Sequence, residues 1–259
     1  MKSFISPQTY VSMGGSMIID AHVHLGGPDR GDGSKQSVEE LLERMDRAGV
    51  ERAVVFPFNE AEPGISFASA NNFIAKAQRE HGERIIGFAR LDPHCREGAI
   101  LEAKRALGEL ELKGIKLHPT AQRFYPDHPF VVRILQTAAR FSVPVVFDNG
   151  KPESRNAELA RLAELVPGAT IILAHMRGEG FIEACEGRDN VYLGTVKAKP
   201  EHVLKAVETL GAERIIAGSD APYASMRYEM VEKFEALESL SDEEKELIRG
   251  GNMARLLGL

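Results

Sequence analysis

Short apolar runs alternate with longer amphipathic segments through most of the chain. The short runs are rich in Val and Ile and predict eight β-strands, at about 18–24, 52–58, 84–91, 113–118, 143–148, 169–175, 190–196 and 213–219. Between them, apolar residues recur at the i, i+3, i+4 spacing of one helix face, which predicts helices at about 37–48, 69–81, 97–110, 130–141, 155–166 and 200–210. The chain is therefore expected to alternate strand and helix.

Two helix starts carry a capping signal. Ser37 and Glu40 stand three residues apart, as do Ser241 and Glu244. At this spacing each Ser–Glu pair can satisfy two free N–H groups at a helix N-terminus. Gly49 follows the first helical segment, where a left-handed C-terminal cap is common. Helices are thus expected to begin just after Ser37 and Ser241, and the first to end at Gly49.

The alternation favours a single (β/α)8 TIM barrel of the α/β class over residues 17–259. Strands joined through helices pair in parallel, and eight such units in about 240 residues match the usual size of this barrel. An open doubly wound sheet is the alternative, but the turn after the first strand, HVHLGGPDRGDGS, lacks the glycine spacing of a phosphate-binding loop. Residues 1–16 carry one Lys and no apolar core, so they are expected to be an extension or leader.

Composition and charge limit the classes of function. The 259 residues carry a net charge of −6, which gives no electrostatic case for nucleic acid or an anionic membrane surface as a partner. No apolar run approaches the ~20 residues needed to span a bilayer. Cys95 and Cys185 are far apart and match no zinc-binding spacing, so no disulfide framework is expected and a cytoplasmic location fits.

The first strand carries polar residues at alternate positions. In MIIDAHVHL, strict alternation places Asp20, His22 and His24 on one face and the apolar residues on the other. If the apolar face meets helices, the polar face points into the barrel, where unpaired polar groups are costly unless they bind a metal. Two imidazoles on one strand face can share a cation. An exposed edge strand is the alternative explanation.

Polar residues also end four later strands. At the ends of predicted strands four, five, six and eight stand, in that order, Lys116 with His118, Asp148, His175 and Asp220. One such residue alone is most simply a cap or a turn residue. Their coincidence at the carboxyl ends of barrel strands, where enzymes of this fold build their sites, predicts an active site. Basic residues that follow the strands would attract an anion to this mouth: Arg123, Lys151, Arg177, Lys197 and Arg227.

Five stretches carry a family resemblance: DAHVHLGG, GIKLHP, ILAHMRG, GSDAPY and the closing GGNMARLLGL. Through them the chain resembles the amidohydrolase superfamily, in particular its amidohydrolase-2 branch of metal-dependent TIM-barrel enzymes, which includes lactone hydrolases and aromatic-acid decarboxylases. The resemblance implies that His22, His24 and Asp220, with a residue ending strand five, hold one divalent metal. Zinc is expected first, with manganese as an alternative. The resemblance also implies that His175 lies close to the water or the substrate carbonyl.

Asp148 departs from that branch, because a His usually stands at the end of strand five. The stretch VVFDNG leaves three interpretations open. In the first, Asp148 is an oxygen ligand, which completes a predicted metal site of His22, His24, Asp148 and Asp220. In the second, Asp148 orients His22 or His24 without touching the metal. In the third, it only ends the strand in an Asx-turn.

Together these residues predict a metal-dependent hydrolase of a small, carboxylate-bearing lactone, ester or amide. A bound metal lowers the pKa of water toward ~7; Asp220 would take its proton and His175 would stabilise the oxyanion. Four residues are expected to contact the substrate: His118, Lys116, Lys151 and Arg177. The alternatives are a decarboxylase that uses the same site, and a metal-free lactonase or non-catalytic protein that binds a small ligand. A homodimer is compatible with the resemblance.

Overall fold

The computed structural model describes residues 17–62 and 64–259, so the predicted extension at 1–16 lies outside the described residues. The strands that it describes pair in parallel, and they form two sheets in the order β1-β2-β3 and β4-β5-β6-β7-β8-β9. Their bounds are β1 Ile19–Leu25, β2 Arg52–Pro57, β3 Ile85–Gly87, β4 Ala89–Arg90, β5 Ile115–Leu117, β6 Val145–Phe147, β7 Ile171–Leu173, β8 Val191–Gly194 and β9 Ile215–Ile216.

Main-chain hydrogen bonds join the two sheets into one closed barrel. At one seam, β3 and β4 are halves of a single strand around Phe88. The Phe88 N–H donates to Val55 O on β2, and the next N–H, of Ala89, donates to the main chain just ahead of β5. At the other seam, the Asp220 N–H after β9 donates to His22 O on β1 at 2.8 Å. The strands therefore correspond to the eight predicted ones, and the predicted single-domain TIM barrel is confirmed.

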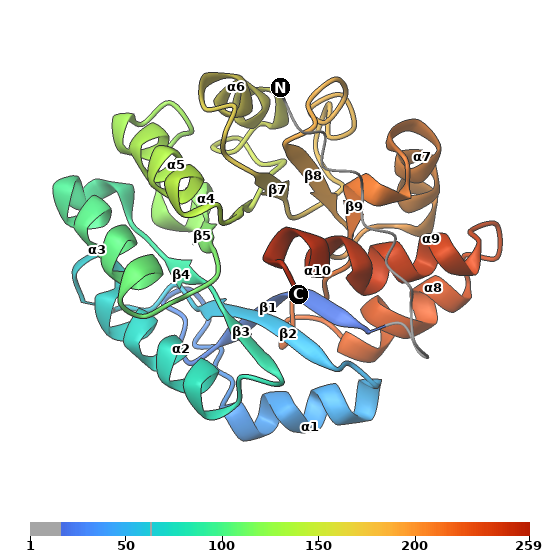
Figure 1. The fold of residues 1–259 in the computed structure, drawn as a ribbon, viewed down its shortest axis with the longest axis horizontal. Coiled ribbons are helices and arrows are strands. Elements are labelled where there is room, and N and C mark those ends of the chain that lie inside the picture. The colour runs from blue at the N-terminus through green and yellow to red at the C-terminus, as the bar shows by residue number, and fades with distance from the viewer. Residues whose placement is uncertain (1–16, 63) are drawn as a thin grey trace, which may run out of the picture.

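Helices surround the strands, as Figure 1 shows. They are α1 Val38–Ala48, α2 Ala68–Glu80, α3 Glu97–Gly108, α4 Pro119–Gln122, α5 Pro129–Phe141, α6 Asn156–Leu165, α7 Pro200–Leu210, α8 Lys233–Glu235, α9 Asp242–Glu246 and α10 Asn252–Leu257. The helices predicted from apolar periodicity are all present, with ends shifted by no more than two residues. The period of the apolar residues thus suffices to locate these helices, because each buries one face against the barrel.

The predicted helix caps are also present. The side chain of Ser37 accepts the N–H of Glu40, and the Glu40 side chain accepts the N–H of Ser37. The same reciprocal pair forms between Ser241 and Glu244 at the start of α9. Gly49 ends α1 with φ of 67°, a conformation that residues with a Cβ rarely adopt.

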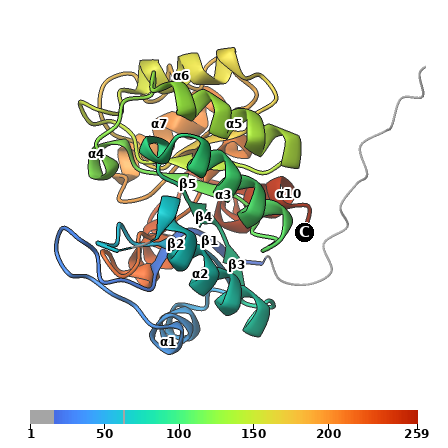
Figure 2. The same cartoon turned by 90° about the vertical axis from the view of Figure 1, so that its left-hand side faces the viewer.

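One end of the barrel is closed by α10. In Figure 2, α10 and α4 lie at opposite ends of the strands, and α4 directly follows the carboxyl end of β5. Met253 on α10 packs with Ile19 and Ile216 in the apolar cluster that fills the inside of the barrel. The interior near α10 is therefore a packed core, and the carboxyl ends of the strands are left for a site.

The first strand departs from the strict alternation that the sequence predicted. A β-bulge interrupts its pairing with β2 between Asp20 and Val23. Ile19 and Ala21 pack inside the barrel, whereas Val23 belongs to the outer core between strands and helices. Asp20 pairs with Ala53, which also packs in the outer core. The prediction that Asp20 faces the interior with the two histidines is therefore wrong.

Asp20 instead fixes the position of β1. Its Oδ1 accepts the N–H of His22 at 3.1 Å and the N–H of Ser219 at 2.9 Å. Burial raises the pKa of Asp20 to about 7, although these hydrogen bonds act to lower it. Since Ser219 immediately precedes Asp220, this carboxyl group ties the His22 backbone to the segment that carries Asp220.

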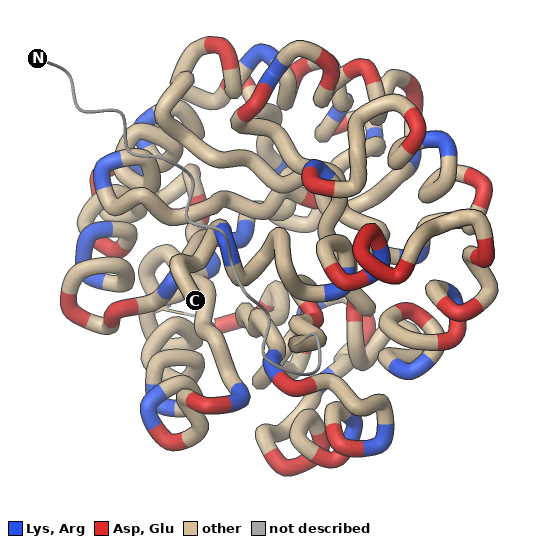
Figure 3. Tube along the Cα trace, turned by 45° about the vertical axis from the view of Figure 1, so that its right-hand side comes forward, with Lys and Arg blue, Asp and Glu red and all other residues tan. Residues whose placement is uncertain are grey.

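The outer surface mixes charges of both signs. Figure 3 shows Lys and Arg interspersed with Asp and Glu over the outer helices. Such a mixture makes no broad field of one sign at the outside of the barrel. Among the helices that the structure describes, none has the length and apolar composition that crossing a membrane requires.

Candidate active site

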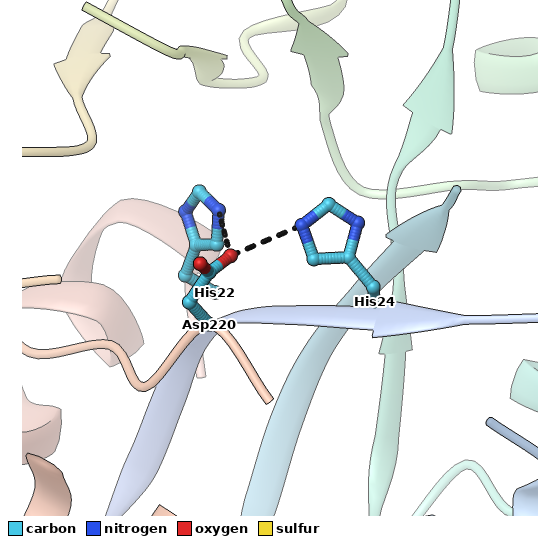
Figure 4. A group of neighbouring side chains, drawn as sticks. All are labelled: His22, His24 and Asp220. Carbon is cyan, nitrogen blue, oxygen red and sulfur yellow. Dashed lines mark hydrogen bonds and ion pairs between the residues drawn. The ribbon is translucent and has the colours of Figure 1, made fainter. Parts of the chain in front are cut away.

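Three side chains from distant parts of the sequence converge at the mouth of the barrel. His22 and His24 come from β1, and Asp220 follows β9. Asp220 Oδ1 lies 3.5 Å from His22 Nε2 and 3.1 Å from His24 Nε2, and all three side chains are buried (Figure 4). The structure thus brings together three of the four residues that the sequence predicted as metal ligands.

The donors of this group fit a divalent metal. One ligand atom from each side chain lies within 4.8 Å of the others. Burial lowers the pKa of both imidazoles, that of His22 strongly, so each ring keeps an uncharged nitrogen with a free lone pair at neutral pH. Two neutral imidazoles and a carboxylate match the three protein ligands of catalytic zinc sites. Imidazole and carboxylate are also ligands of manganese.

Lys197, which the sequence identified only as a loop cation, pairs with Asp220. Its Nζ lies 2.7 Å from Asp220 Oδ2. Burial works to raise the pKa of the Asp220 carboxyl, but the hydrogen bond from His24 and the contact with Lys197 outweigh it and hold that pKa well below its usual range. Asp220 is therefore a permanent carboxylate, suited to binding a metal and poorly suited to accepting a proton.

Lys116 lies on the other side of His22. Its Nζ is 3.3 Å from His22 Nε2 and 4.9 Å from the centroid of the Phe56 ring. Burial lowers the pKa of Lys116 to about 7, although Asp148 opposes the shift. At neutral pH the Lys116 amine is therefore partly uncharged. It competes less with a metal for the lone pair of His22 than a permanently charged lysine would.

Asp148 lies at the same mouth among basic groups. Its Oδ2 is 2.7 Å from Arg177 Nη2 and 3.1 Å from His175 Nε2. His118 Nε2 lies 3.4 Å from the same oxygen, and Lys151 Nζ lies 3.1 Å from Oδ1. Burial works to raise the pKa of Asp148, but the hydrogen bond from His175 and the neighbouring charges hold it well below its usual range.

These contacts bear on the three interpretations of Asp148. Neither carboxylate oxygen accepts a main-chain N–H from the described residues, so the Asx-turn is wrong. The imidazoles that Asp148 contacts belong to His175 and His118 rather than to His22 or His24, so the second interpretation named the wrong partners. Coordination of a metal by Asp148 stays a prediction, since within the described chain the three-residue group is formed without it.

The two ring nitrogens of His175 both face acceptors. Nδ1 lies 3.1 Å from Val196 O, and Nε2 lies 3.1 Å from Asp148 Oδ2. A carbonyl oxygen only accepts, so Nδ1 carries a hydrogen. Burial lowers the pKa of His175, which Asp148 opposes, but two bare acceptors at this distance would repel. Since Asp148 stays a carboxylate, a proton on His175 Nε2 would be donated to Asp148 Oδ2 at this contact.

These groups line one cavity of about 270 Å³. This volume is near the lower limit for small-molecule sites, so it suits a ligand about the size of one substituted ring. All the residues that the sequence predicted for the site line it: His22, His24, Lys116, His118, Asp148, Lys151, His175, Arg177 and Asp220. Of the loop cations, Lys197 also lines it, whereas Arg123 and Arg227 are not among the described residues that do.

The lining also contains residues that were not predicted from the sequence, among them Asp29, Asn59, Arg90 and Tyr223. Arg90 ends the third predicted strand in GFARLDP, so the signal that identified the other strand ends was available there. Asp29 and Asn59 lie in loops, where no periodic pattern marks the residues that turn inward. Tyr223 is the last residue of the motif GSDAPY, and its ring lies against His24 with 5.2 Å between ring centroids.

A family model described as Amidohydrolase matches residues 19–259. Similar solved structures include 5-carboxyvanillate decarboxylase from Sphingomonas paucimobilis, at 17% identity and a TM-score of 0.77, covering 95% of this chain and 100% of that chain. Dihydroxybenzoic acid decarboxylase from Polaromonas, with bound manganese and the inhibitor 2-nitroresorcinol, is similar at 20% identity and a TM-score of 0.74, covering 94% and 97%. An uncharacterised TIM-barrel protein from Bordetella bronchiseptica is similar at 18% identity and a TM-score of 0.75, covering 93% of this chain and 98% of that chain. No curated protein matches this chain.

Proposed function

This chain belongs to the amidohydrolase family of enzymes, and on that premise we propose that it is a metal-assisted decarboxylase of a small aromatic or unsaturated carboxylic acid. The hydrolase that the sequence favoured is the competing function. Two of the similar structures are decarboxylases of ring-bearing carboxylic acids, which supports the choice.

The observation that carries the proposal is the charge of the cavity. In the described chain, its lining has five basic side chains and three carboxylates: Arg90, Lys116, Lys151, Arg177 and Lys197 against Asp29, Asp148 and Asp220. Because the protein as a whole is acidic, this local excess of positive charge favours a small anion. A substituted benzoate supplies the carboxylate and a ring of suitable size.

His22, His24 and Asp220 would hold the metal, zinc or manganese. When bound there, the metal supplies positive charge that polarises an oxygen of the substrate. Asp220 remains a carboxylate throughout, because His24 and Lys197 stabilise its charged form. These three residues therefore serve binding and orientation rather than proton transfer.

Decarboxylation needs a proton for the carbon that loses CO2. In the proposed step, the bond between that carbon and the carboxylate breaks, and its electron pair stays on the carbon. This carbon then takes a proton from protonated His175, whose Nε2 faces Asp148 Oδ2. Arg177 and Lys151 pair with Asp148, so they balance the carboxylate charge that remains after the proton has left.

Hydrolysis would need the opposite kind of group, a base that takes a proton from water. The sequence assigned this role to Asp220. Asp220 has little affinity for a proton, whereas His175 is placed beside the Asp148 carboxylate, which favours its protonated form. This difference between Asp220 and His175 supports decarboxylation over hydrolysis.

The proposal is tested by incubating the protein, loaded with zinc or manganese, with substituted benzoates in D2O. We expect CO2 release and NMR detection of one deuterium at the vacated carbon. His22→Ala should lose both the metal and the activity, whereas His175→Asn should keep the metal and lose activity about 10²–10⁴-fold. Cleavage of lactones or aryl esters without release of CO2 from any acid would show that the enzyme is a hydrolase.

A further inference from the structure

Arg90 is a buried arginine whose charge the described chain leaves without an acidic partner. It lies at the carboxyl end of β4, is 1% exposed and lines the active-site cavity. Its Nη1 donates to Pro57 O at 2.8 Å. Its Nε and Nη2 are buried and have no hydrogen-bond partner among the described residues. These two nitrogens form one edge of the guanidinium group, and this edge matches the two oxygens of a carboxylate.

The position of this arginine is fixed by neighbouring side chains. Asn71 accepts the Arg90 N–H at 2.9 Å and donates to Arg90 O at 3.1 Å. Asn71 also donates to Glu102 Oε1 at 2.8 Å, and Arg105 pairs with Glu102 from the outside. The guanidinium carbon lies 5.4 Å from the centroid of the Phe67 ring. Side chain and backbone are thus held in place before any ligand binds, which lowers the entropic cost of binding.

The other basic residues of the cavity have partners within the described chain. Lys151 and Arg177 pair with Asp148, and Lys197 pairs with Asp220. Lys116 contacts His22 Nε2. Arg90 differs from all of these, since its free edge has neither a carboxylate nor another acceptor in the described residues.

We propose that the Nε and Nη2 edge of Arg90 binds a carboxylate group of the ligand that occupies this cavity. This assignment rests on the proposed function in taking the ligand to be an organic acid. It replaces the assignment of Lys151 and Arg177 as the main carboxylate contacts, because Asp148 already occupies both. A buried charge without a partner costs free energy, and a bound carboxylate would remove this cost through two charge-assisted hydrogen bonds.

The first test is binding of benzoate and 2-hydroxybenzoate, with benzamide as the uncharged control of the same shape. Thermal-shift titration of the as-purified protein should show a rise in melting temperature with at least one of the acids and none with benzamide. Arg90→Gln should raise the Kd for that acid about 30–100-fold, and Arg90→Lys about 10-fold, because Lys keeps the charge and loses the paired geometry. Arg123→Gln, a nearby cation outside the cavity lining, should bind like the wild type.

The second test is the stability of the protein without ligand. Arg90→Met keeps the apolar stem and removes the unpaired charge, so its melting temperature should equal or exceed that of the wild type. Arg105→Met is the matched control. It leaves Glu102 buried without its cation, so its melting temperature should fall. A fall for Arg90→Met as large as that for Arg105→Met would assign Arg90 a structural role instead.

Three results would overturn the inference: no protection of the wild type by either acid, equal protection by benzamide, or unchanged acid binding in both Arg90→Gln and Arg90→Lys. The outcome is separable from that of the proposed function, because binding is measured without turnover. Loss of acid binding in the Arg90 variants, in a protein that releases no CO2, would support the inference and refute the decarboxylase. Release of CO2 by the protein, together with unchanged acid binding in both Arg90 variants, would support the decarboxylase and refute the inference.

Discussion

Substitution of Asp148 by Asn distinguishes two roles for this residue at the mouth of the barrel. In one, Asp148 is the charge partner of Arg177, Lys151 and His175; in the other, it is a metal ligand. Asn keeps the size of the side chain and removes its charge. In the structure, Asp148 is 5% exposed and neutralises Arg177 and Lys151, so the variant leaves two cations without a counter-ion. We expect Asp148→Asn to fold with reduced stability, to keep its metal and to lose decarboxylation.

The magnitude follows from the burial of the groups involved. Removal of one partner from a buried ion pair costs about 3–5 kcal/mol. The side chains of Arg177 and Lys151 are 36% and 34% exposed, so solvent screens part of the loss and about 2–3 kcal/mol is expected. In a protein of this size, that corresponds to a fall of roughly 4–12 °C in melting temperature. Asp189→Asn is the control, because the Asp189 side chain is fully exposed and its substitution should leave the melting temperature unchanged.

Three measurements decide the matter: differential scanning calorimetry for stability, elemental mass spectrometry for metal content after purification without chelator, and the rate of CO2 release. The kcat should fall about 10²–10⁴-fold, since Asn lacks the negative charge with which Asp148 favours protonated His175. Metal content should equal that of the wild type. Loss of the metal together with a melting temperature within 2 °C of the wild type would refute this reasoning and establish Asp148 as a ligand.

Three further outcomes are expected away from the cavity. Lys233→Met should lower the free energy of unfolding by about 3 kcal/mol in urea titrations, because it leaves the buried carboxylate of Glu229 without its cation; an unchanged midpoint would contradict this. Burial raises the pKa of Cys185 to about 12, so its thiol should react with Ellman's reagent at pH 8 only after unfolding. Gly250→Ala should lower the melting temperature strongly, because a Cβ there would lie 1.8 Å from a main-chain oxygen ahead of β1. Gly251→Ala should be tolerated, because the added Cβ would lie 3.4 Å from Leu247 Cδ2, an ordinary contact; equal melting temperatures for the two variants would count against this packing.

The polar residues that end the strands could be recognised from the sequence because a strand end has a local signature. His175 and Asp220 each follow an apolar run, and in a parallel barrel the ends of such runs meet at one mouth. Arg90 has the same signature, since it stands at the end of the apolar run in GFARLDP. Lys197 follows its strand within a loop, where an inward-facing lysine and a solvated one look alike in sequence.

The sequence by itself determined the order of strands and helices, the caps of α1 and α9, and the barrel, because periodicity and capping depend on residues close together in the chain. Only the tertiary structure decided which side chains meet. The bulge at Asp20 turns this residue out of the interior, and the barrel closure places Asp220 beside His22 across nearly two hundred residues. Asp148 shows the difference most clearly. Its position at a strand end can be read from VVFDNG, but its contacts with Arg177 and His175 depend on strand register and rotamers, which no local pattern encodes.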